Sequence, residues 1–101
     1  MDIRIKATKM EMTGAIESAV KEKAGSLEKY FDKIISIDVE VGKTTQHHHK
    51  GDFFRAEINV QVPKKMLRAE AETDDLYKSI NEARDRMKME ITKYKETHQQ
   101  D

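Results

Sequence analysis

Residues 53–73 decide the fold, and they read FFRAEINVQVPKKMLRAEAET. Apolar and polar side chains alternate in two runs, Phe54–Val62 and Leu67–Glu72, which Pro63 and two lysines separate. A repeat of two residues predicts a strand that is buried on one side only. Because proline lacks an amide hydrogen, it suits the end of a strand, and the short break predicts a turn. The stretch therefore predicts two neighbouring strands, each with one apolar and one charged face.

Two more alternating runs lie upstream of this pair. The first covers residues 2–6, where isoleucines alternate with charged side chains. The second covers residues 35–41 and places Ile35 and Ile37 on its apolar side together with two valines. A long polar loop, residues 43–52, joins this run to the stretch described above. The last three strands are therefore predicted to form an antiparallel meander.

Two segments have the spacing of amphipathic helices. Thr13 is expected to cap the first, which runs to about Phe31. Residues 73–75 supply capping oxygens and negative charge for the second, which runs to about Lys95. The apolar positions of the first helix are Ile16, Ala19, Val20, Ala24, Leu27, Tyr30 and Phe31. The predicted buried stripe of the second is Leu76, Ile80, Ala83, Met87, Ile91 and Tyr94.

The predicted order is strand, helix, three strands, helix, in one domain covering residues 1–101. Since every strand has one apolar face, both helices are expected to cover the same face of a four-stranded sheet. The connection through the first helix makes the first strand parallel to its neighbour. The predicted class is α+β, a two-layer β-α-β-β-β-α fold with a mixed sheet, and Ile37 and Ile58 are expected in its core.

Composition excludes several functions. The 101 residues carry nineteen basic and nineteen acidic side chains, so net charge alone points to no nucleic-acid or membrane partner. Cysteine is absent, which excludes disulfides and thiolate chemistry. Apolar runs are short, so no membrane segment or signal peptide is predicted and a cytoplasmic location is expected. No catalytic motif is found, so we expect no enzyme, no catalytic residue, no cofactor and no small-molecule substrate.

His47, His48 and His49 form a cluster in the long polar loop. Imidazoles are good ligands for zinc, copper or nickel, but adjacent histidines in a loop seldom converge on one ion. The preferred interpretation is a solvated loop tip, so no metal site is predicted. A partly protonated tip that touches phosphates is a further interpretation.

Charge becomes informative when it is counted by segment. Residues 78–95 carry six basic and three acidic side chains, so the second helix is the basic element. At about 100° per residue, Arg84, Lys88 and Lys95 lie on one flank of its buried stripe, and Arg86 and Lys93 lie on the other. A solvated helix face with intrahelical ion pairs explains many such patterns. Contact with phosphates is the functional interpretation.

Two stretches resemble the hallmark segments of a known family. They are residues 27–34, LEKYFDKI, and residues 67–80, where LRAEAE leads to Asp74, Asp75, Leu76, Tyr77 and Ile80. They are similar to segments of the bacterial ribosome hibernation promoting factors, a family that includes the ribosome-associated inhibitor. The resemblance covers nearly the whole chain, with the same order of elements, and the length resembles the short form of the family.

The resemblance implies a function without chemistry. Members bind the small ribosomal subunit between head and body during starvation, where they overlap the messenger path and the A and P positions of transfer RNA. The implied protein is a plug that binds ribosomal RNA, is monomeric off the ribosome, contacts no membrane, and silences translation.

The resemblance also implies positions for the ribosomal RNA contacts. Those that match basic positions of the family are Lys23, Lys29, Arg86, Lys93 and Lys95. Periodicity adds Arg84 and Lys88, which are not family hallmarks. Many members carry a basic residue where this chain has Ser26 and Met89. Pairing of two ribosomes is not implied, because short forms need a separate partner for it.

Three other interpretations stay open. The first is a different RNA-binding module of similar architecture, since a fold alone does not fix a function. The second is a protein-interaction adaptor that uses the open, charged face of the sheet. The third is a metal-binding protein built on the histidine loop.

Overall fold

The structure is a computed structural model that describes residues 1–44 and 51–98. The elements follow one another as predicted, with a short 3₁₀ helix added after the first helix. They are β1 (Asp2–Thr8), α1 (Gly14–Gly25), η1 (Ser26–Tyr30), β2 (Ser36–Thr44), β3 (Phe53–Val62), β4 (Lys65–Thr73) and α2 (Leu76–His98).

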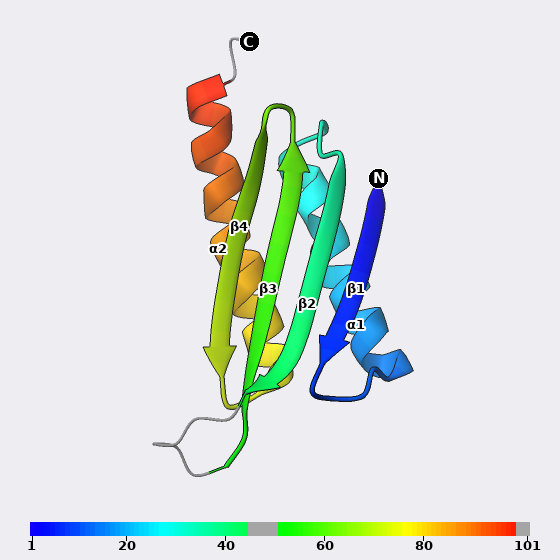
Figure 1. The fold of residues 1–101 in the computed structure, drawn as a ribbon. Helices are drawn as coiled ribbons and strands as arrows, with labels where there is room; N and C mark the ends of the chain where they lie inside the picture. Colours follow the sequence, from blue (N-terminus) through cyan, green and yellow to red (C-terminus); the bar gives the residue numbers. More distant parts are fainter. Residues whose placement is uncertain (45–50, 99–101) are drawn as a thin grey trace.

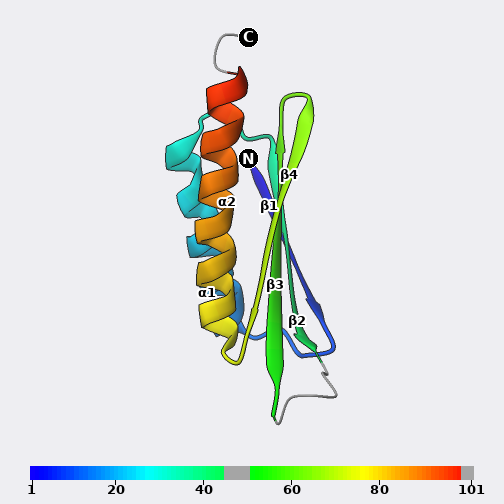
Figure 2. The ribbon, with the colours of Figure 1, turned by 90° about the vertical axis from the view of Figure 1, so that its left-hand side faces the viewer.

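The strands form one mixed sheet in the order β1-β2-β3-β4. Strand β1 is parallel to β2, and the other neighbouring pairs are antiparallel, as predicted. Figure 1 shows the sheet in front of both helices, and Figure 2 shows the two layers from the side, with both helices on one face. The predicted fold class is confirmed, and no helix of the described residues covers the other face of the sheet.

The core lies between the sheet and the helices. Ile37 and Ile58 are 0% and 1% exposed, which confirms their predicted place in the core. Every residue of the predicted stripe of α2 is buried, and Ser79, which the pattern did not include, is buried with them. Its hydroxyl donates to the backbone oxygen of Phe54 at 2.8 Å and accepts from the backbone amide of Thr73 at 3.1 Å. These bonds join the start of α2 to two strands.

The first helix differs from the prediction at its end. Thr13 caps it as expected, because its hydroxyl accepts from the backbone amide of Ile16 at 3.1 Å. The α-helix stops at Gly25, however, and the chain continues as the 3₁₀ helix η1. Glycine weakens a helix, and the Ser26 hydroxyl donates to the backbone oxygen of Lys23 at 2.6 Å, which favours a tighter turn. The prediction of one continuous helix to Phe31 was therefore wrong.

Ile35 is the second departure from the prediction. Its side chain is 55% exposed, whereas Ile34 is 8% exposed and belongs to the core. Strand β2 begins only at Ser36, so the alternation does not extend back to Ile35. The backbone amide of Ile35 nevertheless donates to the backbone oxygen of Gln61 at 2.8 Å. The chain is thus held at the sheet before its side chains begin to alternate.

Candidate nucleic-acid interface

Basic side chains of α2 contact the segment formed by α1 and η1. Arg84 Nη1 lies 3.4 Å from the hydroxyl of Ser26. Lys88 Nζ lies 4.8 Å from the ring centroid of Tyr30, and Lys95 Nζ donates to the backbone oxygen of Tyr30 at 2.8 Å. The flank predicted from helical periodicity therefore faces the first helix, and we call its surface the helix groove, defined by Lys29, Tyr30, Arg84, Lys88 and Lys95.

Tyr30 is the centre of this groove. Lys29 of η1 also places its Nζ over the Tyr30 ring, at 5.4 Å from the centroid. An aromatic ring attracts cations, so Tyr30 favours the position of both ammonium groups. The sequence pattern had assigned Tyr30 to the apolar side of the first helix. The family-like segment 27–34 was the only sequence signal for a functional role of Tyr30. The contact between Tyr30 and Lys88 could not be predicted from sequence, because it depends on the tertiary structure.

The lysines of the helix groove are not neutralised within the described parts of the chain. Lys29, Lys88 and Lys95 form no ion pair with any residue in 1–44 or 51–98. Arg84 differs, because its Nε lies 2.7 Å from a carboxylate oxygen of Asp85. The groove therefore presents at least three ammonium groups to solvent, and such groups attract phosphates.

The remaining predicted contact residues lie apart from the groove centre. Arg86 is on the opposite flank of α2 and donates to the backbone oxygen of Glu70 on the edge strand β4. Lys93 on the same flank lies 3.6 Å from a carboxylate oxygen of Glu90. Lys23 is in the last turn of α1. The structure thus brings together Lys29, Arg84, Lys88 and Lys95, and it separates Arg86 and Lys93 from them.

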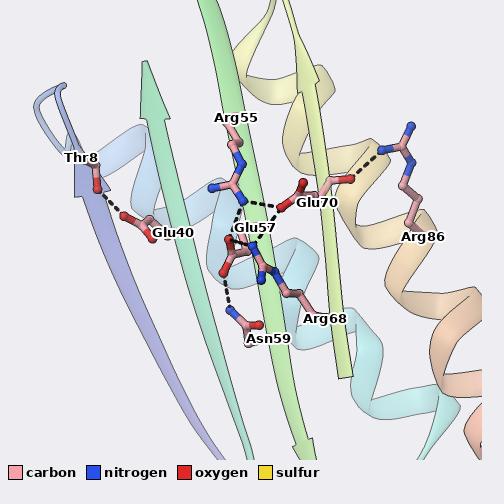
Figure 3. Close-up of polar contacts among 8 residues, drawn as sticks. All are labelled: Thr8, Glu40, Arg55, Glu57, Asn59, Arg68, Glu70 and Arg86. Carbon is pink, nitrogen blue, oxygen red and sulfur yellow. Dashed lines mark hydrogen bonds and ion pairs between the residues drawn. The ribbon is translucent and has the colours of Figure 1, made fainter. Parts of the chain in front are cut away.

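The open face of the sheet carries charges of both signs that bind one another (Figure 3). Arg55 of β3 forms ion pairs with Glu57, at 2.6 Å, and with Glu70. Arg68 of β4 pairs with the same two carboxylates at 3.0 and 3.2 Å. The amide of Asn59 donates to Glu57 at 2.8 Å. We call these five residues the sheet network, and nearby Arg4 pairs with Asp38 at 2.7 Å.

The sheet network lowers the proton affinity of its carboxylates. The hydrogen bond from Asn59 lowers the pKa of Glu57 most. Burial of Glu57 raises this pKa, and the contacts with Arg55 and Arg68 lower it further. The net result is a pKa of Glu57 below its usual value. The hydrogen bond and charge of Arg55 lower the pKa of Glu70 in the same direction. Both groups are therefore held in the charged form that their arginine partners favour.

A metal centre finds no support in the described residues. No cluster of three or more histidine, aspartate or glutamate side chains in residues 1–44 and 51–98 is placed to hold an ion. His47, His48 and His49 lie outside the described residues, so the prediction for their loop stays a prediction. None of the described helices is long and apolar enough to cross a membrane.

Comparison with solved structures places this architecture among known folds. A ribosomal subunit interface protein from Coxiella burnetii has a TM-score of 0.77 at 21% identity, over 94% of this chain and 98% of that one. The N-terminal domain of Protein Y from Thermus thermophilus has a TM-score of 0.73 at 29% identity, over 93% and 99%. The first similarity concerns the fold alone, and the second adds a moderate similarity of sequence.

Comparison of sequences gives the family. Residues 3–99 match the family described as Sigma 54 modulation protein / S30EA ribosomal protein. The chain is 30% identical over 101 residues to the ribosome hibernation promoting factor of Pseudomonas putida, covering 98% of this chain and 91% of that protein. It is 28% identical over 95 residues to the ribosome hibernation promotion factor of Bacillus subtilis, of which it spans about half, 49%. The chain therefore belongs to the Sigma 54 modulation protein / S30EA ribosomal protein family and is related to the ribosome hibernation promoting factors.

Proposed function

We propose that residues 1–101 act as one unit that binds the small ribosomal subunit at its decoding region, blocks messenger and transfer RNA there, and silences translation under stress or starvation. The observation that carries the proposal is the helix groove, in which Lys29, Lys88 and Lys95 surround Tyr30 without a carboxylate partner in the described residues. Membership of the family and the names of the relatives support the ribosome as the partner.

The spacing of the basic residues along α2 suits a chain of phosphates. Arg84 and Lys95 are eleven residues apart on α2, which corresponds to about 16 Å along a helix. Basic groups spread over this distance meet several phosphates of one RNA strand instead of a single one. Each ammonium group that neutralises a phosphate releases a condensed counterion, so binding gains free energy and becomes dependent on salt.

The mechanism needs no chemical step. A protein that occupies the decoding region excludes other ligands by volume, so inhibition is stoichiometric and reversible. The affinity comes from contacts with the RNA backbone, which position the protein and carry no sequence information by themselves. The choice of the ribosome over other RNA then depends on the match of the whole helix side to the shape of the site.

Co-sedimentation in density gradients tests the proposal. The purified chain is mixed with small subunits, large subunits or an RNA duplex, and bound protein is measured at several salt concentrations. We expect binding to small subunits, weaker binding to the other two, and competition by transfer RNA. If about five phosphates are neutralised, the logarithm of affinity should fall with the logarithm of salt at a slope of roughly −3.5 to −4.5.

A second assay measures how the added protein changes translation in a cell-free extract. Added protein should reduce translation in proportion to its amount, and excess small subunits should restore it. Equal affinity for small subunits and for the RNA duplex would favour a different RNA-binding module. Absence of ribosome binding with little salt dependence would favour a protein-interaction adaptor.

A further inference from the structure

A hollow of about 580 Å³ lies at one end of the molecule, where η1, the turn between β3 and β4, and the C-terminal end of α2 meet. In Figure 1 it is the end at which α2 finishes. Its lining combines aromatic and basic side chains, and those that matter here are Tyr30, Tyr94, His98, Lys33, Lys64 and Lys95. The volume is within the range of sites that hold small organic ligands.

The aromatic side of the hollow is built by stacked rings. Tyr94 and His98, one turn apart on α2, stack with their centroids 4.4 Å apart and their planes at 20°. The Tyr94 hydroxyl donates to the backbone oxygen of Pro63 at 2.8 Å, which fixes this ring against the turn. Phe31 meets the same ring edge-on at 5.5 Å. His98 is only partly buried and lines the hollow, and aromatic rings of this kind stack with other flat rings.

The basic side of the hollow includes a lysine in an unfavourable backbone conformation. Lys64 has φ 69°, the left-handed region in which glycine or asparagine is preferred at the second central position of a turn. The turn nevertheless places a lysine there, beside the hollow. Lys33 and Lys64 form no ion pair with a described residue, although Glu28 and Asp32 also line the rim. Local strain of this kind is often retained where the side chain is used.

We propose that this hollow binds one unstacked nucleotide. The base stacks on the aromatic side, where His98 continues the Tyr94 ring. The phosphate lies between Lys33, Lys64 and Lys95, and the rim carboxylates of Glu28 and Asp32 accept hydrogen bonds from the ribose hydroxyls. The nucleotide has two possible sources, a residue extruded from an RNA strand or a free mononucleotide. The RNA source rests on the proposed function, whereas the free nucleotide does not.

Titration of the full chain with AMP, followed by amide chemical shifts, tests the proposal, and CMP, adenosine and inorganic phosphate serve as separate probes. We expect saturable shifts confined to residues 28–33, 63–65 and 94–98, with half-saturation on the order of 1 mM or below. Adenosine or phosphate alone should bind more weakly than AMP, since each supplies only one of the two contacts.

Two matched variants separate binding from folding. Lys64→Gly removes an ammonium group and also relieves the left-handed strain, so it should weaken AMP binding about fivefold while the melting temperature stays equal or rises. Lys9→Gly is the control, because Lys9 is the other described non-glycine residue at positive φ, at 59°. It follows the end of β1 at Thr8, and the strand register places that end of the sheet opposite to the turn between β3 and β4. The melting temperature of this control should likewise stay equal or rise, and its AMP titration should match that of the parent.

Binding of the same variants to small subunits distinguishes the sources. If an RNA nucleotide occupies the hollow, Lys64→Gly weakens subunit binding by a similar factor, whereas for a free nucleotide subunit binding is unchanged. The absence of saturable shifts with AMP and CMP at about 10 mM overturns the proposal, as does a Lys64→Gly variant that titrates like the parent. Failure of subunit binding in all variants would contradict the proposed function and leave the AMP result standing.

Discussion

The open face of the sheet and the helix groove both carry basic side chains, but those of the sheet network are paired with carboxylates and the lysines of the groove are not, within the described residues. On the sheet, Arg55 and Arg68 are bound by two carboxylates, so their charge is consumed within the molecule (Figure 3). In the groove, Lys29 and Lys88 share one aromatic ring and have no carboxylate partner in the described residues. A chain with zero formal net charge can still present a positive surface, because its charges are distributed unevenly, with six basic and three acidic side chains in residues 78–95.

The difference follows from the geometry of the two elements. In β3 and β4, the register places Glu57 opposite Glu70 and Asn59 opposite Arg68, so long side chains of both signs meet on one face. On α2, Arg84 and Lys88 are four residues apart, and Lys95 follows seven residues later, so they share one flank. The carboxylates of this helix fall at other angles. Net charge therefore says less about a binding surface than the pairing of its charges does.

The largest expected effect comes from truncating a side chain of the core on which both regions rest. Ile58 lies in β3 with 1% exposure, and its neighbours Glu57 and Asn59 belong to the sheet network. Ile58→Ala should lower the free energy of unfolding by about 2–5 kcal/mol, through lost burial and a cavity. Denaturant unfolding measures this loss. Signals from the sheet and from Tyr30 should vanish in one transition, and two separate transitions would contradict a common core.

The next effect concerns the sheet network alone. The Glu57 side chain is 15% exposed and binds two arginines and Asn59, so Glu57→Gln should cost about 1–2 kcal/mol at pH 7. Because the folded protein lowers the pKa of Glu57 below its usual value, the contribution of Glu57 to stability is present above that usual value and is lost as pH falls through the folded pKa. The difference between parent and variant should therefore shrink in acid.

A matched control for this prediction is Glu96→Gln, which removes an exposed carboxylate of α2. Thermal melts between pH 7 and 3 should show the parent and this control losing stability together, with Glu57→Gln less sensitive to acid. Ribosome binding at pH 7 should be unchanged in both variants. A loss of binding in Glu57→Gln would indicate that the sheet face contributes to the partner surface.

The smallest effect is expected at the loop that joins the two central strands. Replacing His47, His48 and His49 together by Ala should change the melting temperature little, with or without zinc, because adjacent loop residues rarely complete a coordination shell. Calorimetry of the parent and the variant, with and without zinc, measures the melting temperatures. A zinc-dependent rise of several degrees that the substitution abolishes would instead support a metal site.

Much of the fold follows from periodicity, because a sheet with one buried face and an amphipathic helix both leave simple patterns. The stripe of α2 and the inward residues of β3 were predictable for this reason. Ser79 was not, because its burial depends on a partner, the backbone oxygen of Phe54, that the topology supplies. The end of α1 at Gly25 was missed since apolar spacing continues through η1 to Tyr30.

The candidate site was predictable in part. Helical angles separated the flank of Lys88 from the flank of Arg86, but they did not show which flank faces the first helix. The facing flank depends on the packing of η1 beside α2, which places the Tyr30 ring next to Lys88. The pairing of charges on the sheet face could not be predicted from the sequence either, because it depends on the register of β3 and β4. The role of the basic residues in RNA binding remains a proposal.

Three double variants that change net charge equally test which surface of the molecule binds RNA. Lys29→Glu with Lys88→Glu alters the helix groove, Arg86→Glu with Lys93→Glu alters the other flank of α2, and Arg4→Glu with Lys6→Glu alters the sheet face. All six side chains are exposed, so the fold should survive, which circular dichroism checks.

Binding to small subunits is then measured by co-sedimentation over a range of salt. We predict that the groove variant loses affinity by on the order of 100-fold and flattens the salt slope by about 1.4 to 1.8, since two phosphate contacts are removed. The variant of the other flank should lose less, and the sheet-face variant about threefold at most. A sheet-face variant that loses as much affinity as the groove variant would contradict the assignment of the RNA-binding surface to the helix groove.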